Sequence, residues 1–387
     1  MDSRDIALVR ANFRTVSYSA HSRGKLTNAF YGQLFGRDPA LRQLFPPAMD
    51  VTRHRFILAL QFILDSLDTP GAAEEFLEQL ARDHRKYGVD AKHYRSAADA
   101  LLIALRAHTG EALWTDPLDT AWTRFTDLIA NSMIAGAEAD DLPAHWEATV
   151  VGQHQLLDDL ALVRLRADAP IPYESGQYLP IRIPQTPNMW RYLSPAIPAN
   201  DGGELEFHVR KVRGGWVSPS IVNDTKPGDR WLIGAPLGGL HVDYECGRNV
   251  LMIGSGTGIA PLRAQVMEMA RRGVNPQVHL FLGGVYPRDL YDLENMWRLS
   301  LINPWLSVIP VAEHQNNPWW HPEPPPETPP GMHRRLTGSI GHIVTSFGSW
   351  AEHQVQLAGS PEMVYTTTQT LIAAGVPEER ISHDPLW

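Results

Sequence analysis

Hydrophobic residues recur every three or four positions through the first 140 residues, which is the spacing of one face of an α-helix. The two longest series are Tyr94, Ala98, Leu101, Leu102 and Leu105, and Leu118, Trp122, Phe125, Ile129 and Met133. A third helix, from about residue 71, has Phe76, Leu77, Leu80 and Ala81 on one face. His84 continues that apolar face at the next turn, so its side chain is expected to point inward. We therefore predict an all-helical first part.

After Trp146 the hydrophobic runs become shorter and are separated by turn residues, which is typical of strands. The first runs are HQLLDDLALVRLRA, QYLPIRIP, ELEFHVRKV and DRWLIGAP, and they predict a small antiparallel β-barrel. Later runs, at VHLFLGG, LSVIPVAE and VQLAGSP, alternate with helical segments, as a parallel doubly wound α/β sheet requires. We therefore expect a multidomain chain with boundaries at 1–141, 146–244 and 245–387.

Glycine and proline mark the same change of character. Residues 1–145 contain 7 of the 30 glycines and 6 of the 31 prolines, and helices avoid both residues. The most biased segment, residues 318–330 (PWWHPEPPPETPP), has too much proline for a helix or a central strand. We interpret it as an exposed loop, with a polyproline ligand as the alternative.

Composition and charge narrow the possible functions. With 43% hydrophobic and 20% charged residues the 387-residue chain can bury full cores. The net charge of −9, with both signs scattered, argues against a nucleic-acid surface. No run reaches about 18 apolar residues and the start lacks a signal pattern, so we expect a cytoplasmic protein without a membrane segment. One cysteine, Cys246, excludes a thiolate zinc site or a cysteine-held iron–sulfur cluster.

A histidine on an apolar helix face is either a hydrogen-bonded core residue or a metal ligand. The segments AFYGQLFGRDPALRQLF (29–45) and RDHRKYGVDAKHY (82–94) resemble the globin part of flavohaemoglobins. The resemblance implies haem b, with His84 on the iron, Tyr94 beside it, Tyr31 over the distal face and Phe45 against the porphyrin. A distal phenol can donate to iron-bound dioxygen. Leu58 is expected to form the distal wall, with His54 as a distal neighbour.

One position departs from the family. Relatives have a glutamate late in the last globin helix, where it accepts hydrogen bonds from the proximal histidine and tyrosine. The corresponding residue here is Ala137, followed by Glu138. Neighbouring helical residues point about 100° apart, so Glu138 is not expected to replace the missing carboxylate.

The barrel region resembles the FAD domain of ferredoxin-reductase-type enzymes, through SGQYLPIRI, WRYLSPA and GGWVSPSI in the family's order. The resemblance assigns cofactor-binding roles to Arg191, Tyr192 and Ser194, and to the backbone of Gly215, Trp216, Val217 and Ser218. Arg191 can neutralise the flavin pyrophosphate. The family motif is Arg-x-Tyr-Ser, whereas this chain has Leu193 at the tyrosine position. The stack of an aromatic ring on the flavin is therefore in question.

The segment NVLMIGSGTGIAPLRAQVMEMA combines a buried strand, a glycine-rich turn and a helix, an arrangement that brings backbone amides to a dinucleotide pyrophosphate. This is the nicotinamide signature of ferredoxin reductases, and its expected binding residues are Gly254, Gly256, Thr257, Gly258, Ala260 and Pro261. Relatives have an arginine after the second strand, where this chain has Val285. NADH is therefore favoured over NADPH.

The family's Cys-Gly-x-Pro near the nicotinamide appears here as Ala358-Gly359-Ser360-Pro361, with Met363 two residues on. Gly359 and Met363 are therefore expected near the cofactor, without the usual thiol. Trp387, at the end of the chain, is expected either to stack on the flavin or to lie on the surface.

The order of globin, flavin domain and nicotinamide domain is that of flavohaemoglobins. A flavin accepts an electron pair from NAD(P)H and releases single electrons to a haem. The resemblance implies nitric oxide dioxygenation, with O₂, NO and NAD(P)H as small-molecule partners. Three alternatives stay open: an NADH oxidase or reductase using O₂, peroxide or quinones, a low-turnover haem or redox sensor, and a flavin reductase with a haemless helical domain.

Overall fold

The computed structural model describes residues 1–46, 48–69, 71–139, 141–187, 189–321, 323 and 327–384. The chain forms two compact units, Met1–His145 and Trp146–Trp387. Among the described residues no helix combines the length and the apolar character needed to cross a bilayer.

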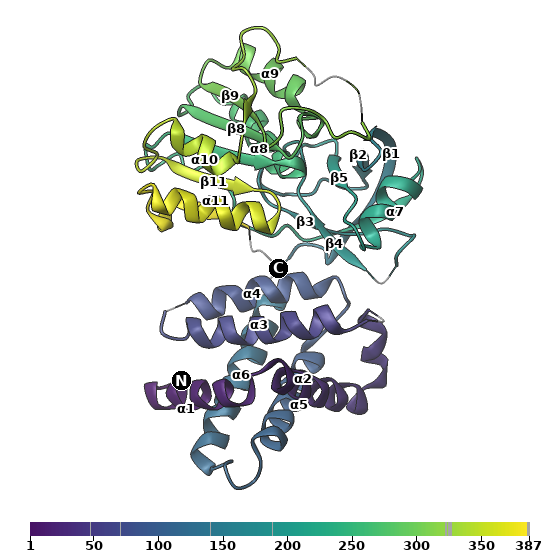
Figure 1. Cartoon of the computed structure of the whole chain (residues 1–387). Coiled ribbons are helices and arrows are strands. Elements are labelled where there is room, and N and C mark those ends of the chain that lie inside the picture. The colour runs from purple at the N-terminus through teal and green to yellow at the C-terminus, as the bar shows by residue number, and fades with distance from the viewer. Residues whose placement is uncertain are drawn as a thin grey trace. The chain divides into compact units, whose positions relative to one another are not determined.

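The first unit is helical, as the spacing of its hydrophobic residues predicted (Figure 1). Its helices are α1 (Ser3–Val16), α2 (Ala20–Arg37), η1 (Pro39–Leu44), α3 (Asp50–Ser66), α4 (Ala72–Arg85), α5 (Ala91–Thr109) and α6 (Asp116–Glu138). Side-chain hydrogen bonds cap the N-termini of several helices. Ser19 caps α2 by accepting from the Ser22 amide, and Asp90 and His93 form a reciprocal capping box at α5.

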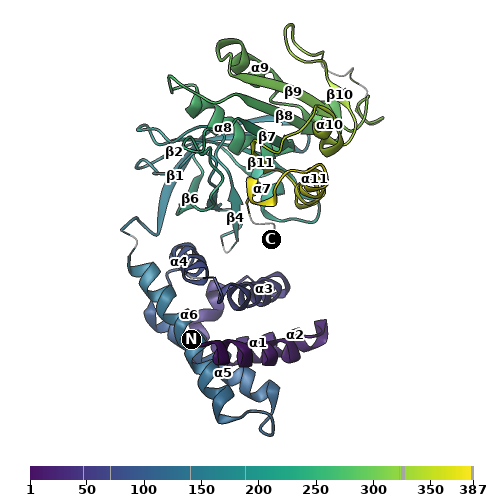
Figure 2. The ribbon, with the colours of Figure 1, turned by 90° about the vertical axis from the view of Figure 1, so that its left-hand side faces the viewer.

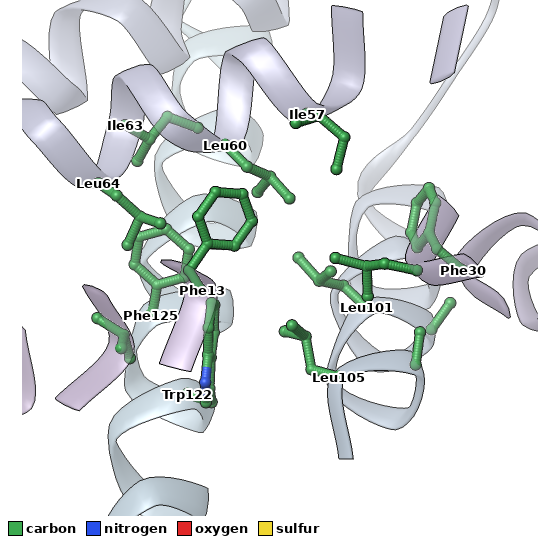
Figure 3. Close-up of a cluster of buried hydrophobic side chains, with 14 of the residues drawn as sticks. Phe13, Phe30, Ile57, Leu60, Ile63, Leu64, Leu101, Leu105, Trp122 and Phe125 are labelled. Atoms are coloured by element: carbon green, nitrogen blue, oxygen red, sulfur yellow. The ribbon is translucent and has the colours of Figure 1, made fainter. Parts of the chain in front are cut away.

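Aromatic side chains from distant helices form the core of this unit. Phe13 of α1 lies beside Trp122 and Phe125 of α6, and all three are almost fully buried (Figure 3). The Trp122 indole donates to the Asn12 side-chain oxygen at 3.0 Å, so its polar atom is satisfied. At the other side of the core, Phe30 lies with Leu101 (Figure 3).

Helices α3 and α4 lie side by side (Figures 1 and 2), with the rings of Phe62 and Phe76 4.7 Å apart. Helix α4 also packs closely on α6, because Gly136 has no side chain. A Cβ atom there would lie 2.7 Å from the Glu78 Cα atom. The position of α4, which carries His84, therefore depends on a glycine in another helix.

The second unit begins with an antiparallel six-stranded sheet in the order β4-β3-β6-β1-β2-β5. Its strands are β1 (His145–Leu157), β2 (Leu160–Ala167), β3 (Leu179–Arg182), β4 (Trp190–Leu193), β5 (Glu204–Arg210) and β6 (Arg230–Gly234). A bridge between Pro195 and Phe207 brings the β4 end back to β5. The predicted barrel is confirmed, and helix α7 (Val217–Asp224) follows β5.

The parallel sheet that follows has the order β10-β9-β8-β7-β11-β12. Its strands are β7 (Val250–Ser255), β8 (Val278–Gly284), β9 (Leu306–Ala312), β10 (Leu336–Thr337), β11 (Gln354–Ala358) and β12 (Ile381–His383). The connecting helices are η2 (Gly256–Gly258), α8 (Ile259–Met269), η3 (Pro287–Asp289), α9 (Leu293–Ile302), α10 (Ile340–Ser346), α11 (Pro361–Ala373) and η4 (Glu378–Arg380).

Both faces of this sheet are covered, as the continuous hydrophobic strands predicted. Val250 and Met252 of β7 pack with α8 and α9, whereas Leu251 and Ile253 pack with α10 and α11. The two helical layers are visible on opposite sides of the sheet in Figure 2. The described part of segment 318–330 contains no helix or strand.

Candidate functional site

His84 lies in the last turn of α4 as a half-buried neutral imidazole. Its Nδ1 atom is 2.7 Å from the Leu80 carbonyl oxygen, and as the N–H tautomer Nδ1 donates to that oxygen. Burial lowers the pKa of His84, and the nearby Asp83 carboxylate opposes this effect only in part. The remaining nitrogen, Nε2, then carries the lone pair that an iron ion needs. These features fit a haem iron ligand.

His84 does not belong to a larger set of metal ligands. The described residues contain no group of three or more His, Cys, Asp or Glu side chains placed to hold a metal ion. A porphyrin, which supplies four nitrogen ligands of its own, needs a single protein ligand on the proximal side. The donor set therefore suits haem better than a bare ion.

Tyr94, near the start of α5, is buried, and its hydroxyl has no hydrogen-bond partner in the described residues. Burial raises its pKa to about 12. Ala137 is partly buried against the core, and Glu138 is exposed on the next position of α6. The phenol therefore lacks the acceptor that the family's glutamate would supply.

Tyr31 of α2 is buried among aromatic rings. The ring centroids of Phe30, Phe45 and Phe56 lie 4.8, 5.6 and 5.9 Å from that of Tyr31. Burial raises the pKa of Tyr31, with the positive charge of Arg53 acting in the opposite direction. The hydroxyl therefore keeps its proton and is a hydrogen-bond donor at neutral pH. Tyr31 and Phe45 are neighbours, and their roles at a haem stay predictions.

His54 and Leu58 do not face Tyr31. Both are exposed on α3, Leu58 to 38%. Phe56, between them in the sequence, is the α3 residue that packs on Tyr31 and stacks on Phe30 at 4.3 Å. Two positions along a helix correspond to about 200°, so His54 and Leu58 point away from the Tyr31 side. Phe56, which the sequence analysis did not single out, is the α3 residue beside Tyr31, and the distal roles of His54 and Leu58 stay predictions.

In the second unit, β4 presents Arg191 and Tyr192 on the surface of the barrel. Both side chains are exposed, and the Tyr192 ring lies edge-on to Tyr178 at 5.4 Å. Leu193 packs against the barrel core instead, and Ser194 is half-buried. The chain thus offers a cation and two tyrosines on one exposed edge, a donor set that suits a flavin pyrophosphate and ring. Tyr178 was not predicted as a site residue.

The N-terminus of α7 lies next to this barrel and has no side-chain cap. Trp216 is 74% exposed, whereas Val217 is fully buried in the barrel core, so Val217 offers its backbone alone. The Ser218 hydroxyl accepts from the Val212 amide at 3.0 Å and holds the loop before the helix. A Cβ at Gly215 would lie 3.1 Å from the Val212 oxygen. Uncapped amides at a helix start suit a phosphate group.

Asp384 is a further residue that the sequence analysis did not predict. Its Oδ1 atom is buried without a hydrogen-bond partner among the described residues, and an added Cβ at Gly238 would lie 2.7 Å from it. The same Cβ would lie 2.8 Å from the Tyr178 ring, so Asp384 belongs to the tyrosine edge of the barrel. Burial raises the pKa of Asp384 to about 7. Trp387 lies outside the described residues.

The glycine-rich turn after β7 lies at the point where the strand order reverses. β7 is flanked by β8 on one side and by β11 on the other. From β8 the sheet continues through β9 and β10, whereas on the other side β12 follows β11. In open parallel sheets, ligands bind outside the carboxyl ends of the strands at such a switch point. Gly256 has φ +56°, and a Cβ added there would meet nothing within 4 Å, so its backbone is open to a ligand.

The other glycines of this turn are needed for packing. A Cβ at Gly258 would lie 2.1 Å from the Ala358 carbonyl oxygen at the end of β11. A Cβ at Gly359 would lie 2.3 Å from the Met363 Cε atom. The ends of β7 and β11 therefore meet closely, bringing the Gly254–Pro261 and Ala358–Met363 segments together. Thr257 is half-exposed here, whereas Ala260 and Pro261 are buried in α8. The arrangement fits a dinucleotide at the switch point.

Comparison with known proteins finds matches to three families in successive parts of the chain. Residues 28–133 match the globin family, residues 147–242 match the oxidoreductase FAD-binding domain, and residues 252–369 match the oxidoreductase NAD-binding domain. Fold and sites together define a haem-, FAD- and NAD(P)H-dependent oxidoreductase that joins a globin to a reductase.

The reductase part is 31% identical to a ferredoxin–NAD(P)⁺ reductase of Metapseudomonas resinovorans, over 63% of this chain and 70% of that protein. A flavohemoprotein of Bordetella pertussis is 27% identical over 65% of this chain and 68% of its own length. The flavohemoglobin of Malassezia yamatoensis, solved with bound FAD and heme, has the same fold across 99% of this chain and 98% of its own, with a TM-score of 0.78 and 17% identity. In domain order and fold the chain is similar to the flavohaemoglobins.

Proposed function

We propose that this protein is a nitric oxide dioxygenase, which converts NO and O₂ to nitrate with electrons from NADH. The observation that carries the proposal is the combination of two sites in one chain. One is a half-buried neutral imidazole, His84, whose N–H is oriented by the Leu80 carbonyl. The other is a nucleotide turn at the switch point of a flavin reductase. The flavin supplies conversion of a hydride into single electrons, and the haem supplies O₂ binding.

The residues of the globin unit have distinct tasks in this proposal. His84 holds the iron from the proximal side, and Tyr31 donates its phenol proton as a hydrogen bond to a ligand on the distal side. The Phe30, Phe45 and Phe56 rings pack around Tyr31 and fix the position of its ring.

In the reductase, Arg191 and the α7 amides neutralise the flavin pyrophosphate. Tyr178 and Tyr192 orient the ring system, and Asp384, whose pKa is raised by burial to about 7, can hold a proton near that edge. Gly256 lets the backbone approach the dinucleotide.

The preference for NADH has support from Arg288. NADPH carries a further phosphate on its adenosine ribose, which reductases bind with arginine. Arg288 is the arginine that follows β8, and it is almost buried in ion pairs with Asp158 and Asp159 of the barrel. Val285 precedes it without a charge. We expect kcat/KM for NADH to exceed that for NADPH by about tenfold or more, equal to about 1.4 kcal/mol.

One observation favours the oxidase or sensor alternatives. The Tyr94 hydroxyl lacks the acceptor that would make the proximal imidazole more electron-donating. A weaker donor slows the activation of O₂ and favours reversible ligand binding.

An anaerobic absorption experiment tests the proposal. The full chain, reconstituted with haem and FAD, is mixed with NADH, and the haem and flavin bands are followed. Reduction of both, followed by stoichiometric conversion of NO to nitrate when O₂ is admitted, is expected. Haem that stays ferric in the presence of NADH would overturn the dioxygenase proposal. Rapid NADH oxidation by O₂ that NO does not accelerate would identify an oxidase.

A further inference from the structure

A cavity of about 500 Å³ lies in the first unit between α2 and the segment that leads into α3. Asn28, Tyr31 and Arg42 line it from one side, and Asp50 and Arg53 from the other. Tyr31 is the residue that the cavity shares with the proposed distal site. Phe45, Phe56 and His84 are not part of its lining.

The polar groups around this cavity are mainly hydrogen-bond donors. Asn28 contributes an amide, Tyr31 a protonated phenol, and Arg42 and Arg53 contribute guanidinium groups. One Nη of Arg42 donates to the carbonyl oxygens of Phe45 and Pro46, both at 3.1 Å, which fixes this guanidinium along the wall.

The acid in the lining does not neutralise these charges. The side chain of Asp50 is 92% exposed, and its nearest oxygen is 4.0 Å from an Arg53 Nη atom. Such a contact with a carboxylate in water is worth little. The cavity therefore has a net positive charge.

The Nε atom of Arg53 is an unused donor. It is buried, and no acceptor among the described residues reaches it. A buried donor without an acceptor is unfavourable, and more so when it belongs to a charged group. Arg53 lines the cavity, so an anion bound there lies beside this guanidinium. A planar oxyanion suits an arginine best, because two of its oxygens match the Nε–Nη edge of a guanidinium.

We propose that this cavity binds a small planar oxyanion and that nitrate is the oxyanion it takes in the working protein. The choice of nitrate rests on the proposed function, because nitrate is its product. Tyr31 then belongs both to the site where nitrate is made and to the donor-rich cavity that receives it. Oxyanion binding itself does not depend on that chemistry.

The test uses the haem-loaded full chain in its ferrous carbonyl form, in which CO blocks the iron and the protein is diamagnetic. Sodium nitrate is titrated at constant ionic strength against sodium chloride, and the NMR signal of the Arg53 Nε–H is followed. The signal is assigned by its absence in Arg53→Lys. A saturable shift with nitrate that chloride does not reproduce is expected.

Variants provide an independent measurement. Nitrate is expected to raise the thermal midpoint of the wild type and of Arg55→Gln, which removes an exposed arginine from the same helix. In Arg53→Gln the nitrate affinity is expected to fall by about tenfold or more, the effect of losing a hydrogen bond to a charged group. If Arg53→Gln does not fold, Asn28→Ala takes its place with the same expectation.

An unmoved Arg53 signal, or equal responses to nitrate and chloride, would overturn the proposal. So would equal nitrate affinity in Arg53→Gln and Arg55→Gln. Nitrate binding in a protein that fails to consume NO would overturn the dioxygenase function and the role of nitrate as product, while the oxyanion site would stand.

Discussion

The hydroxyl of Tyr31 can be tested without disturbing its packing. Tyr31→Phe keeps the ring among Phe30, Phe45 and Phe56 and removes one donor. Loss of a hydrogen bond to a polarised ligand costs about 1.5–3 kcal/mol, so O₂ should dissociate from the ferrous protein about ten- to a hundredfold faster. Stopped-flow measurement of O₂ release checks this. Tyr18→Phe, at a ring 78% exposed, is the matched control. An unchanged rate would show that the hydroxyl does not reach the ligand.

Asp384 predicts a pH dependence of stability. Its folded pKa of about 7 lies above the ordinary value of 3.8, so the folded state binds more protons than the unfolded state between these pH values. The free energy of unfolding should therefore fall as the pH rises from about 4 to 7, by up to about 1.4 kcal/mol per pH unit. Asp384→Asn should flatten this part of the profile.

Urea unfolding at pH 5 and pH 7.5 measures the effect of Asp384. The exposed Asp201→Asn is the control and should keep the wild-type profile. If Asp384→Asn keeps it too, the carboxyl is already ionised in the folded protein below neutral pH.

Single residues were predictable where a motif fixed their position. His84 and Tyr31 lie where the globin-like segments placed them, although their roles stay predictions. His54 and Leu58 lie on the other side of α3 from Tyr31, and nothing in the sequence fixes the phase of that helix. That helix starts after Met49 without a side-chain cap, and a shift of one residue turns its face by about 100°. Asp384 became visible only when folding brought the end of the chain to Gly238.

At the scale of the elements, the crossing of α4 and α6 is the most sensitive contact of the first unit. Gly136→Ala would place a methyl group 2.7 Å from the Glu78 Cα atom, so the helices must separate. Overpacking of this kind costs about 1–3 kcal/mol. Gly24→Ala, in an open position of α2, should instead stabilise by about 0.5–1 kcal/mol.

The two alanine variants are compared by thermal unfolding of the haem-loaded chain and by haem affinity. Gly136→Ala should weaken haem binding as well as stability, because α4 carries His84. Opposite signs for the two variants are the expected result. A Gly136→Ala protein as stable as Gly24→Ala would show that α4 can shift freely.

Elements were predicted best where burial of one or both faces determines the pattern of hydrophobic residues. The alternation in β2 and the continuous runs of β8 and β9 gave strands at nearly the observed positions. HQLLDDLALVRLRA proved to span a hairpin, with Asp158 and Asp159 between β1 and β2. The pairing order of both sheets depends on contacts between segments far apart in sequence, and no local pattern specifies it.

At the scale of the whole reductase unit, a buried charge network joins the barrel to the nucleotide-binding sheet. Glu206 of β5 is almost buried and accepts from Arg164 Nε at 2.7 Å and from Arg263 of α8 at 2.5 Å. The His208 Nε2 atom lies 3.2 Å from a Glu206 carboxylate oxygen, and the His208 Nδ1 atom lies 2.8 Å from the Tyr291 hydroxyl. Burial acts to raise the pKa of Glu206, but hydrogen bonds from His208 and Arg263 outweigh it and hold the pKa well below its ordinary 4.5.

This network matters because hydride transfer needs the nicotinamide at a fixed place over the flavin. Arg263 belongs to the helix that follows the nucleotide turn, and Glu206 belongs to the flavin barrel. Removal of one partner leaves the other charge buried, which is far more costly than loss of a surface pair.

Glu206→Gln should therefore lower the free energy of unfolding of the reductase unit by about 2–4 kcal/mol at pH 7. Glu204→Gln is its matched control, because Glu204 is on the same strand as Glu206 but makes an exposed ion pair, with Arg166. This variant should change stability by about 0.5 kcal/mol or less. The difference between wild type and Glu206→Gln should shrink as the pH falls below about 4.5, where the folded carboxylate begins to lose its advantage over the unfolded one.

Flavin reduction by NADH separates positioning from stability in the same variants. Under conditions where both variants are fully folded, Glu206→Gln should reduce its flavin more slowly than Glu204→Gln at saturating NADH, because the two cofactor sites are less firmly held together. Equal rates would mean that the network stabilises the unit without setting its hydride-transfer geometry. Equal stability of the two variants would show that the buried and the exposed pair contribute alike, against the burial that distinguishes them.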